Sequence, residues 1–383
     1  MTEHDVVAFA SGLSARLASR SRHVCVFLGA GTSKACGLPD VQTLQASVLA
    51  KLPVPDQPAF EAMLVGRNLE QALSRVRRIS AVATGTDTVD GLNGVSAKEL
   101  DTKICELIIA ELTVGATTTG PVDLLSAWVA RADYTRPLEL FTVNYDLLIE
   151  NALERRKVPY FDGFVGYLNG RFRTDLVEAD SNDAMTGIPS FFARLWKLHG
   201  SLNWSQGHDG EHGELVRQGV PVQGGSVAAI YPSDSKYEES RRMPFVVLQD
   251  RLRRALAEPE TLMLISGYSW SDDHLNELFF DAATQRPRSE IIAFCFDNIP
   301  EPLARAAAAT PNLQIVTKSE AIIGGIRESW KTPADGLPED LWQHGGVQLG
   351  DFGSLASFLA RGTSPIQPLP AETEPHTTTG PDA

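Results

Sequence analysis

The feature that most constrains the fold of this chain is a series of short apolar segments that alternate with helical stretches. The apolar segments are rich in β-branched and aromatic residues, as buried strands are; they cover residues 23–28, 138–142, 194–198, 226–231, 262–265, 291–296 and 313–316. Helical periodicity lies between several of them, over residues 146–156, 243–257, 272–284 and 301–309. This alternation predicts an α/β fold with a doubly wound, largely parallel sheet.

The same patterns divide the chain into five segments. Residues 1–44 contain an amphipathic helix over 4–20 and the first strand, and residues 45–135 carry mainly helical periodicity, which predicts an inserted helical module. Residues 136–330 supply the remainder of the sheet, with a Gly-rich, polar surface excursion at 163–190. Residues 331–362 form a C-terminal segment. Residues 363–383 are rich in Pro and Thr and poor in apolar side chains, so we expect them to be disordered.

Composition argues against several classes of protein. The chain has 383 residues, with 34 Lys and Arg against 48 Asp and Glu, so its formal net charge is −14. This balance argues against direct nucleic-acid binding, because phosphate contacts need a basic surface. The four cysteines form no C-x-x-C pair, so we expect no zinc ribbon and no bound metal. No apolar run approaches the roughly 18 residues of a membrane helix, and the N-terminus lacks a secretory pattern, so we expect a cytoplasmic protein with no membrane contact.

The first candidate site is the glycine-rich loop after the strand at 23–28. It reads Gly29-Ala30-Gly31-Thr32-Ser33 and is followed by Gly37-Leu38-Pro39-Asp40. Glycines at a strand end let backbone N–H groups approach a diphosphate, and the N-terminus of the next helix favours an anion. A tight strand-to-helix turn explains the same glycines without a ligand. The dinucleotide fingerprint G-x-G-x-x-G is absent, because Lys34 occupies the position of its third glycine.

Polar residues follow two further strands. Asn144 and Asp146 come after the strand at 138–142, and ligands bind at such strand ends in parallel sheets. Either residue is also a favourable cap for the helix at 146–156, and both interpretations hold if the two residues differ in role. His199, before a glycine at the end of the strand at 194–198, is placed for proton chemistry. The alternative is a histidine whose ring is satisfied by a backbone carbonyl.

Two later strands end in residues that suit a nucleotide. Gly267 and Ser269 lie in a turn after the strand at 262–265, where hydroxyl and N–H groups can reach a phosphate. Asp297 follows the strand at 291–296, where a carboxylate accepts hydrogen bonds from ribose hydroxyls in dinucleotide-binding folds. An ordinary turn and a loop aspartate are the alternative interpretations.

The order of these motifs resembles the sirtuin family over roughly residues 20–320. The resemblance implies a Rossmann-like sheet with a smaller inserted module, and cleavage of the nicotinamide–ribose bond of NAD. It implies that Asn144 contacts the nicotinamide ribose and positions the attacking group, that Asp146 holds the carboxamide and that His199 is the general base. The first loop would line the diphosphate and ribose, and the later loops the adenosine. The implied NAD-binding residues are Gly29, Ala30, Gly31, Thr32, Ser33, Pro39, Asp40, Gly267, Ser269 and Asp297.

The chain departs from protein-deacetylating sirtuins in two ways. Those proteins carry two C-x-x-C pairs of a zinc module soon after the His-Gly motif, whereas no cysteine lies between His199 and Phe294 here. Their Gly-Ile-Pro-x-Phe-Arg motif becomes Gly-Leu-Pro-Asp-Val-Gln at residues 37–42. The lost aromatic residue shields the reaction from water in sirtuins, so Val41 favours hydrolysis over transfer to acetyl-lysine.

Four phrases look like the branch of sirtuin-like proteins found in bacterial antiphage defence. They are residues 68–73 (NLEQAL), 142–150 (TVNYDLLIE), 231–237 (YPSDSKY) and 267–277 (GYSWSDDHLNE). They are similar to the sirtuin-like subunits that pair with a HerA-type ATPase. This resemblance implies an NAD hydrolase that depletes NAD on infection, with such an ATPase as partner, and we also expect a homo-oligomer. The alternatives are a zinc-free deacylase or ADP-ribosyltransferase, and a module that senses NAD or ADP-ribose without turnover.

Overall fold

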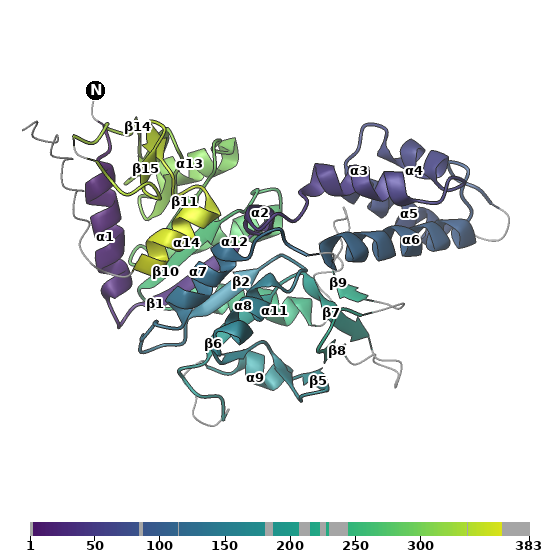
Figure 1. The fold of residues 1–383 in the computed structure, drawn as a ribbon, viewed down its shortest axis with the longest axis horizontal. Helices are drawn as coiled ribbons and strands as arrows, with labels where there is room; N and C mark the ends of the chain where they lie inside the picture. Colours follow the sequence, from purple (N-terminus) through teal and green to yellow (C-terminus); the bar gives the residue numbers. More distant parts are fainter. Residues whose placement is uncertain are drawn as a thin grey trace, which may run out of the picture.

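A computed structural model describes residues 3–83, 87–113, 115–180, 187–206, 215–222, 227–229, 244–334 and 336–361 of the chain. Its centre is a nine-stranded sheet with helices on both faces (Figure 1). The strands, in spatial order, are β14 (Ile326–Ser329), β13 (Glu320–Ile323), β12 (Leu313–Val316), β11 (Glu290–Phe294), β10 (Thr261–Ser266), β1 (His23–Leu28), β2 (Glu139–Thr142), β6 (Ala193–Lys197) and β3 (Tyr160–Phe161). All neighbours from β12 to β3 run parallel, and the pairs β12–β13 and β13–β14 are antiparallel. The predicted α/β class with a largely parallel, Rossmann-like sheet is confirmed.

Both faces of the sheet are buried, because side chains of each strand alternate between two cores. In β1, Val24, Val26 and Leu28 belong to one core, and Cys25 and Phe27 to the other. The first core is covered by α1 (Val6–Ala18), α7 (Gly120–Val129), α8 (Leu148–Arg155) and α14 (Phe352–Arg361). The second is covered by α11 (Phe245–Ala257), α12 (Asp273–Gln285) and α13 (Glu301–Ala309). This double cover explains why the strands form near-continuous apolar runs in the sequence.

A separate helical module follows α2 (Ala30–Ala35). It consists of α3 (Val41–Lys51), α4 (Gln57–Leu64), α5 (Leu69–Val82) and α6 (Gly94–Thr113), which lie together to one side of the sheet (Figure 1). Its own core includes Phe60, Leu73 and Ile104. Residues 45–135 were expected to form one insertion, but α7 packs elsewhere. Val122 and Trp128 of α7 belong to the core of the main sheet, so this helix covers the sheet itself.

A second, antiparallel sheet takes its first two strands from residues 163–190, which we expected to be a surface excursion. Its strands, in order, are β4 (Phe164–Val165), β5 (Asn169–Phe172), β8 (Leu215–Gln218), β7 (Gly200–Gln206) and β9 (Val227–Ala229), and α9 (Thr174–Glu178) follows β5. Phe164 and Trp204 are buried with ring centroids 4.9 Å apart, and both belong to the second core of the main sheet. The described part of the expected strand at 226–231, β9, thus pairs with β7 and not with the parallel strands.

The C-terminal part adds a short hairpin, β15 (Trp342–Gln343) and β16 (Gly346–Val347), before α14. None of the helices in the described ranges combines the length and apolar character that a membrane crossing requires. Residues 231–237, which contribute to the family resemblance, and residues 363–383 lie outside the described residues.

Candidate active site

The register of the parallel strands brings the candidate residues to one edge of the sheet. Leu28 at the end of β1 pairs with Thr142 of β2 and with Ser266 of β10. Thr142 in turn pairs with Lys197, the last residue of β6. Ser266 pairs with Phe294, the last residue of β11. Apart from Pro39 and Asp40, which follow α2, every candidate residue comes soon after one of these five strand ends, so these residues converge on the carboxyl edge of the sheet.

The strand order also reverses at this edge. From β1 the chain continues to β2 and β6 on one side, and it then crosses to β10, β11 and β12 on the other. In open parallel sheets a ligand binds in the crevice where the order reverses, outside the carboxyl ends of the strands. Here that position lies between the loops that follow β1 and β10.

Three glycines hold these two loops in close contact. A Cβ atom on Gly29 would lie 2.5 Å from the Gly267 carbonyl oxygen, and one on Gly31 would lie 2.7 Å from the Gly267 Cα. Gly267 has a φ of 64° and would place its own Cβ 2.5 Å from the Thr32 nitrogen. The Gly31 N–H donates to the Gly267 carbonyl at 2.8 Å. The glycines of the first motif are therefore required by the packing of one loop on the other, and the Gly31 N–H is already bonded within the chain.

A cavity of about 650 Å³ opens beside this contact. It brings together five of the predicted residues, Ala30, Gly31, Gly267, Ser269 and Asp297. Its wall also includes residues that sequence reasoning had not selected, among them Lys34, Tyr268, Trp270, Phe296, Asp351 and Phe352. Phe296 is 66 % exposed, and it lines the cavity together with Asp297. The cavity combines apolar walls with a few polar groups, as small-molecule sites do.

Asn144 forms the centre of a second, buried group. Its side-chain Nδ2 donates to the Gly29 carbonyl at 3.0 Å, the Thr32 hydroxyl at 3.0 Å and the Ser33 hydroxyl at 2.8 Å. Its backbone N–H donates to the Thr142 hydroxyl at 3.0 Å. Asn144 therefore ties the loop after β2 to the loop after β1, and it is only 8 % exposed.

Asp146 bonds both to the first loop and to the start of the next helix, and only the second of these contacts was predicted from the sequence. Its Oδ2 accepts a hydrogen bond of 2.6 Å from the Ser33 hydroxyl. Its Oδ1 accepts one of 3.0 Å from the Leu148 N–H, at the first turn of α8. The carboxylate thus stabilises the start of a helix and also contacts the first loop. Asn144, Asp146, Thr32 and Ser33 consequently form one hydrogen-bonded group.

His199 lies in the turn between β6 and β7 and is 5 % exposed. Its Nε2 is 3.5 Å from Oδ2 of Asp272. Asp272 also caps α12, because its Oδ1 accepts from the Leu275 N–H at 3.3 Å. A carboxylate beside an imidazole is the arrangement that orients a general base.

Pro39 and Asp40 lie apart from both groups, in the connection between α2 and α3. Asp40 caps α3 through a 2.9 Å hydrogen bond from the Thr43 N–H, and it pairs with Lys34 Nζ at 2.8 Å. The hydrogen bond from Lys34 holds the pKa of Asp40 below its usual range. Lys34 is part of the cavity wall, so Asp40 connects to the cavity through this ion pair. The described wall includes neither Pro39 nor Asp40.

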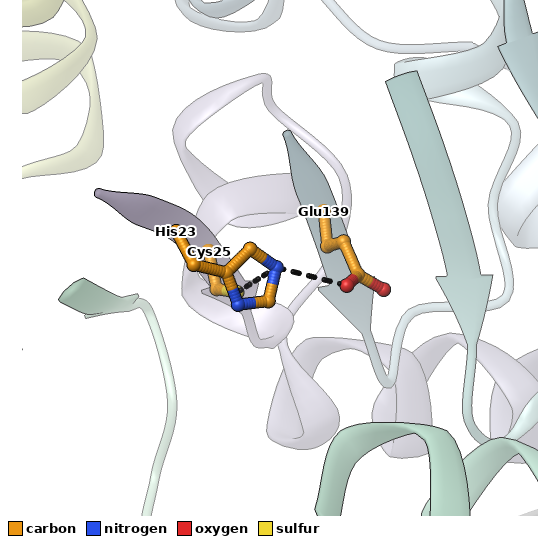
Figure 2. Close-up of side chains that lie close together, drawn as sticks. All are labelled: His23, Cys25 and Glu139. Carbon is orange, nitrogen blue, oxygen red and sulfur yellow. Dashed lines mark hydrogen bonds and ion pairs between the residues drawn. The ribbon is translucent and has the colours of Figure 1, made fainter. Parts of the chain in front are cut away.

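His23, Cys25 and Glu139 form a buried cluster at the opposite, amino edge of the sheet (Figure 2). Atoms of these three side chains that can bind a metal lie within 4.8 Å of one another. The Glu139 carboxylate, however, accepts hydrogen bonds from Arg251 at 2.5 and 2.8 Å and from the Trp196 indole at 2.6 Å. Because its oxygens are occupied and a guanidinium lies beside them, the cluster fits an ion-pair network better than a metal site.

The neighbouring charges in this cluster shift the pKa values of Glu139 and His23. Burial alone would raise the pKa of Glu139, but Arg251 and His23 outweigh it and hold that pKa below its usual range. Burial also opposes a charged imidazole, yet Cys25 and Glu139 raise the pKa of His23 to about 10. Burial raises the pKa of the Cys25 thiol. His23 and Glu139 therefore form a charged pair at neutral pH.

Comparison with known protein families finds a match over part of the chain. Residues 138–316 match the family described as a SIR2-like domain. The match covers somewhat less than half of the chain and includes Asn144, Asp146, His199, Gly267 and Asp297, whereas the Gly29–Asp40 region precedes it. No curated protein matches the chain. Over these residues the chain is thus similar to SIR2-like domains, and this supports the sirtuin-like family that its motifs indicate.

Proposed function

We propose that the protein is an NAD hydrolase that cleaves the nicotinamide–ribose bond to give nicotinamide and ADP-ribose. The observation that carries the proposal is the convergence of Asn144, Asp146 and His199 on the carboxyl edge of the sheet, in a region similar to SIR2-like domains. The adjacent cavity of about 650 Å³ supports it, because that volume suits the adenosine part of a dinucleotide.

In this proposal the adenosine lies in the cavity between the loops after β1, β10 and β11. The Asp297 carboxylate accepts hydrogen bonds from the ribose hydroxyls, and Phe296 packs against the adenine. The diphosphate passes the contact between Gly31 and Gly267. The nicotinamide ribose then points toward Asn144, Asp146 and His199, which belong to the loops after β2 and β6.

The reaction itself needs little acid catalysis. The leaving group is a cationic pyridinium, and the glycosidic C–N bond breaks with its electron pair going to the ring nitrogen, so nicotinamide leaves neutral. The ribose passes through an oxocarbenium-like state, as in glycoside hydrolysis. A water oxygen forms the new bond to C1′ and loses its proton to His199, which Asp272 orients. Asn144 aligns the ribose hydroxyls and the water, and Asp146 holds the carboxamide.

The defence role is the part of the proposal that depends on the resemblance alone. We propose that the enzyme is cytoplasmic, acts as an NAD-depleting effector against phage, forms a homo-oligomer and works with a HerA-type ATPase. The proposal includes no metal in the reaction and no direct contact with nucleic acid, for which the net charge of −14 is unfavourable.

Chromatography of NAD incubated with the purified chain, alone and with the HerA-type partner, tests the proposal. The expected products are nicotinamide and ADP-ribose, absent with His199→Ala and with Asn144→Ala. Consumption of NAD that depends on an added acyl-lysine peptide, or that labels a protein, would indicate a deacylase or an ADP-ribosyltransferase instead. Intact NAD in all mixtures despite ADP-ribose binding would indicate a sensing module.

A further inference from the structure

Lys197 is a buried cation next to the candidate active site, and the proposed reaction gives it no role. It is the last residue of β6, two positions before His199, and its side chain is 2 % exposed. Nζ donates to the backbone carbonyl of Tyr145 at 3.2 Å and to the carbonyl of Asp146. It also pairs with Oε1 of Glu150 at 2.8 Å. The three N–H groups of the ammonium thus have three acceptors, and two of these belong to the turn after β2.

The Tyr145 carbonyl collects further donors from the segment that carries His199. The Leu202 N–H donates to it at 3.0 Å, and the Ser201 hydroxyl does so at 3.3 Å. The turn with Asn144 and Asp146 is therefore bound to residues on both sides of His199. Lys197 contributes the only charged donor among these contacts in the described residues, and charge-assisted hydrogen bonds are stronger than neutral ones.

A buried ammonium is unfavourable unless it is paired and fully hydrogen-bonded. In the pair with Glu150, the ammonium has all its acceptors but the carboxylate does not have all its donors. Only Oε1 of Glu150 faces Lys197, while Oε2 has no hydrogen-bond partner in the described residues. Burial raises the pKa of Glu150, and Lys197 opposes that rise. The ion pair with this incompletely bonded carboxylate is a weak reason for burying Lys197. The hydrogen bonds from Lys197 to the two backbone carbonyls explain its burial better.

We propose that Lys197 is a positioning residue for the cleavage site: its ammonium holds the Asn144–Asp146 turn against the turn that carries His199. The expected effect of Lys197 on the rate rests on the proposed NAD cleavage. The contact between Lys197 and the Asn144–Asp146 turn does not depend on that proposal. Lys197 is not among the residues that line the cavity, and it contacts Asp146 through the backbone carbonyl alone, so it acts on kcat through geometry and leaves binding of the adenosine part unchanged.

The test compares Glu150→Gln with the double variant Lys197→Met/Glu150→Gln. The single variant removes the carboxylate charge and leaves Lys197 its two carbonyl acceptors. The double variant buries no charge and keeps the apolar stem, but it has no donor to the turn. We expect kcat about 100-fold lower in the double variant than in the single one, because small misplacements of reacting groups cost about that much. The affinity for ADP-ribose, which lacks the carboxamide, should agree within about 3-fold.

Amide hydrogen exchange over residues 143–148 gives a readout that does not need turnover. We expect exchange there to be at least 10-fold faster in the double variant, with exchange in β10 and β11 unchanged. Equal exchange and equal kcat in the two variants would overturn the inference. So would a loss of ADP-ribose affinity equal to the loss in kcat, because that indicates a general structural role. A wild-type chain that leaves NAD intact contradicts the proposed function instead, and the exchange comparison still decides the role of Lys197.

Discussion

At the scale of single residues, the candidate site is fixed by hydrogen bonds between loops that are distant in sequence. The Asn144 Nδ2 group has two hydrogens and three acceptors, so at least one hydrogen is shared. His199 has a carboxylate neighbour, Asp272, from the loop after β10, although β1 and β2 separate β10 from β6 in the sheet. This crossing of the sheet edge distinguishes the arrangement from a simple helix cap.

Asp272→Asn separates the two roles of that residue. Asparagine caps a helix about as well as aspartate, so α12 and the melting temperature should be unchanged. The variant lacks the negative charge 3.5 Å from His199, and we expect kcat for NAD cleavage to fall about 10-fold. Steady-state kinetics with a thermal melt measures both quantities. A wild-type kcat would show that the carboxylate serves the helix alone.

His23 predicts a pH dependence of stability. Its pKa is raised to about 10, while an unfolded histidine titrates near 6.5. The charged pair with Glu139 therefore stabilises the fold fully below about pH 6.5, and this stabilisation is lost as the pH rises toward 10. Urea unfolding should show a larger loss of stability from pH 6 to pH 9 in the wild type than in His23→Gln. Identical losses in both proteins would contradict the assignment.

Residues such as Asn144, Asp146 and His199 can be selected from the sequence because each follows an apolar strand. Their partners are harder to find. In the sequence, Asp272 looks like an ordinary helix cap and Lys197 like an ordinary strand residue. Their contacts with the site depend on the order of the strands in space. Phe296 and Asp351 line the cavity without belonging to any of the motifs.

At the scale of elements, the approach of the two loops at Gly267 controls the shape of the site. Gly267→Ala has a matched control in Gly324→Ala, since the two glycines have φ values of 64° and 61° but only Gly267 has neighbours around its Cβ position. We expect Gly267→Ala to cost roughly 1–3 kcal/mol more in unfolding free energy, as overpacking does, and to weaken ADP-ribose binding. Calorimetry and urea titration test this. Equal effects of the two substitutions would mean that backbone strain alone accounts for the glycine.

Elements of the second sheet show the limit of pattern analysis. β4 has two residues and β8 has four, so neither is long enough to display a clear alternation. Pairing between β5 and β8 joins segments that are far apart in the chain, and no local signal specifies it. The long apolar strands of the parallel sheet, by contrast, could be recognised one at a time.

At the scale of the whole molecule, the helical module and the sheet have separate cores. Phe60 is fully buried in the core of α3–α6, and Phe60→Ala should cost roughly 3–5 kcal/mol within that module. Hydrogen exchange should become faster over residues 41–113, while ADP-ribose binding in the cavity stays the same. Loss of binding together with the faster exchange would show that the module also maintains the site.

The class of fold could be predicted, and so could the gathering of the candidate residues at one edge, because parallel strands place all their carboxyl ends together. The attachment of α7 could not, since its apolar stripe fits either core equally well in the sequence. Only the packing of Val122 and Trp128 assigns it to the main sheet.

The most direct test of the central claim is the time course of nicotinamide release from NAD, measured at saturating NAD with the wild type and with Asn144→Ala. The account predicts steady release by the wild type, with ADP-ribose in equal amount, and a rate at least about 100-fold lower in the variant. Equal release by both proteins, or nicotinamide release without ADP-ribose, would contradict NAD hydrolysis at this site.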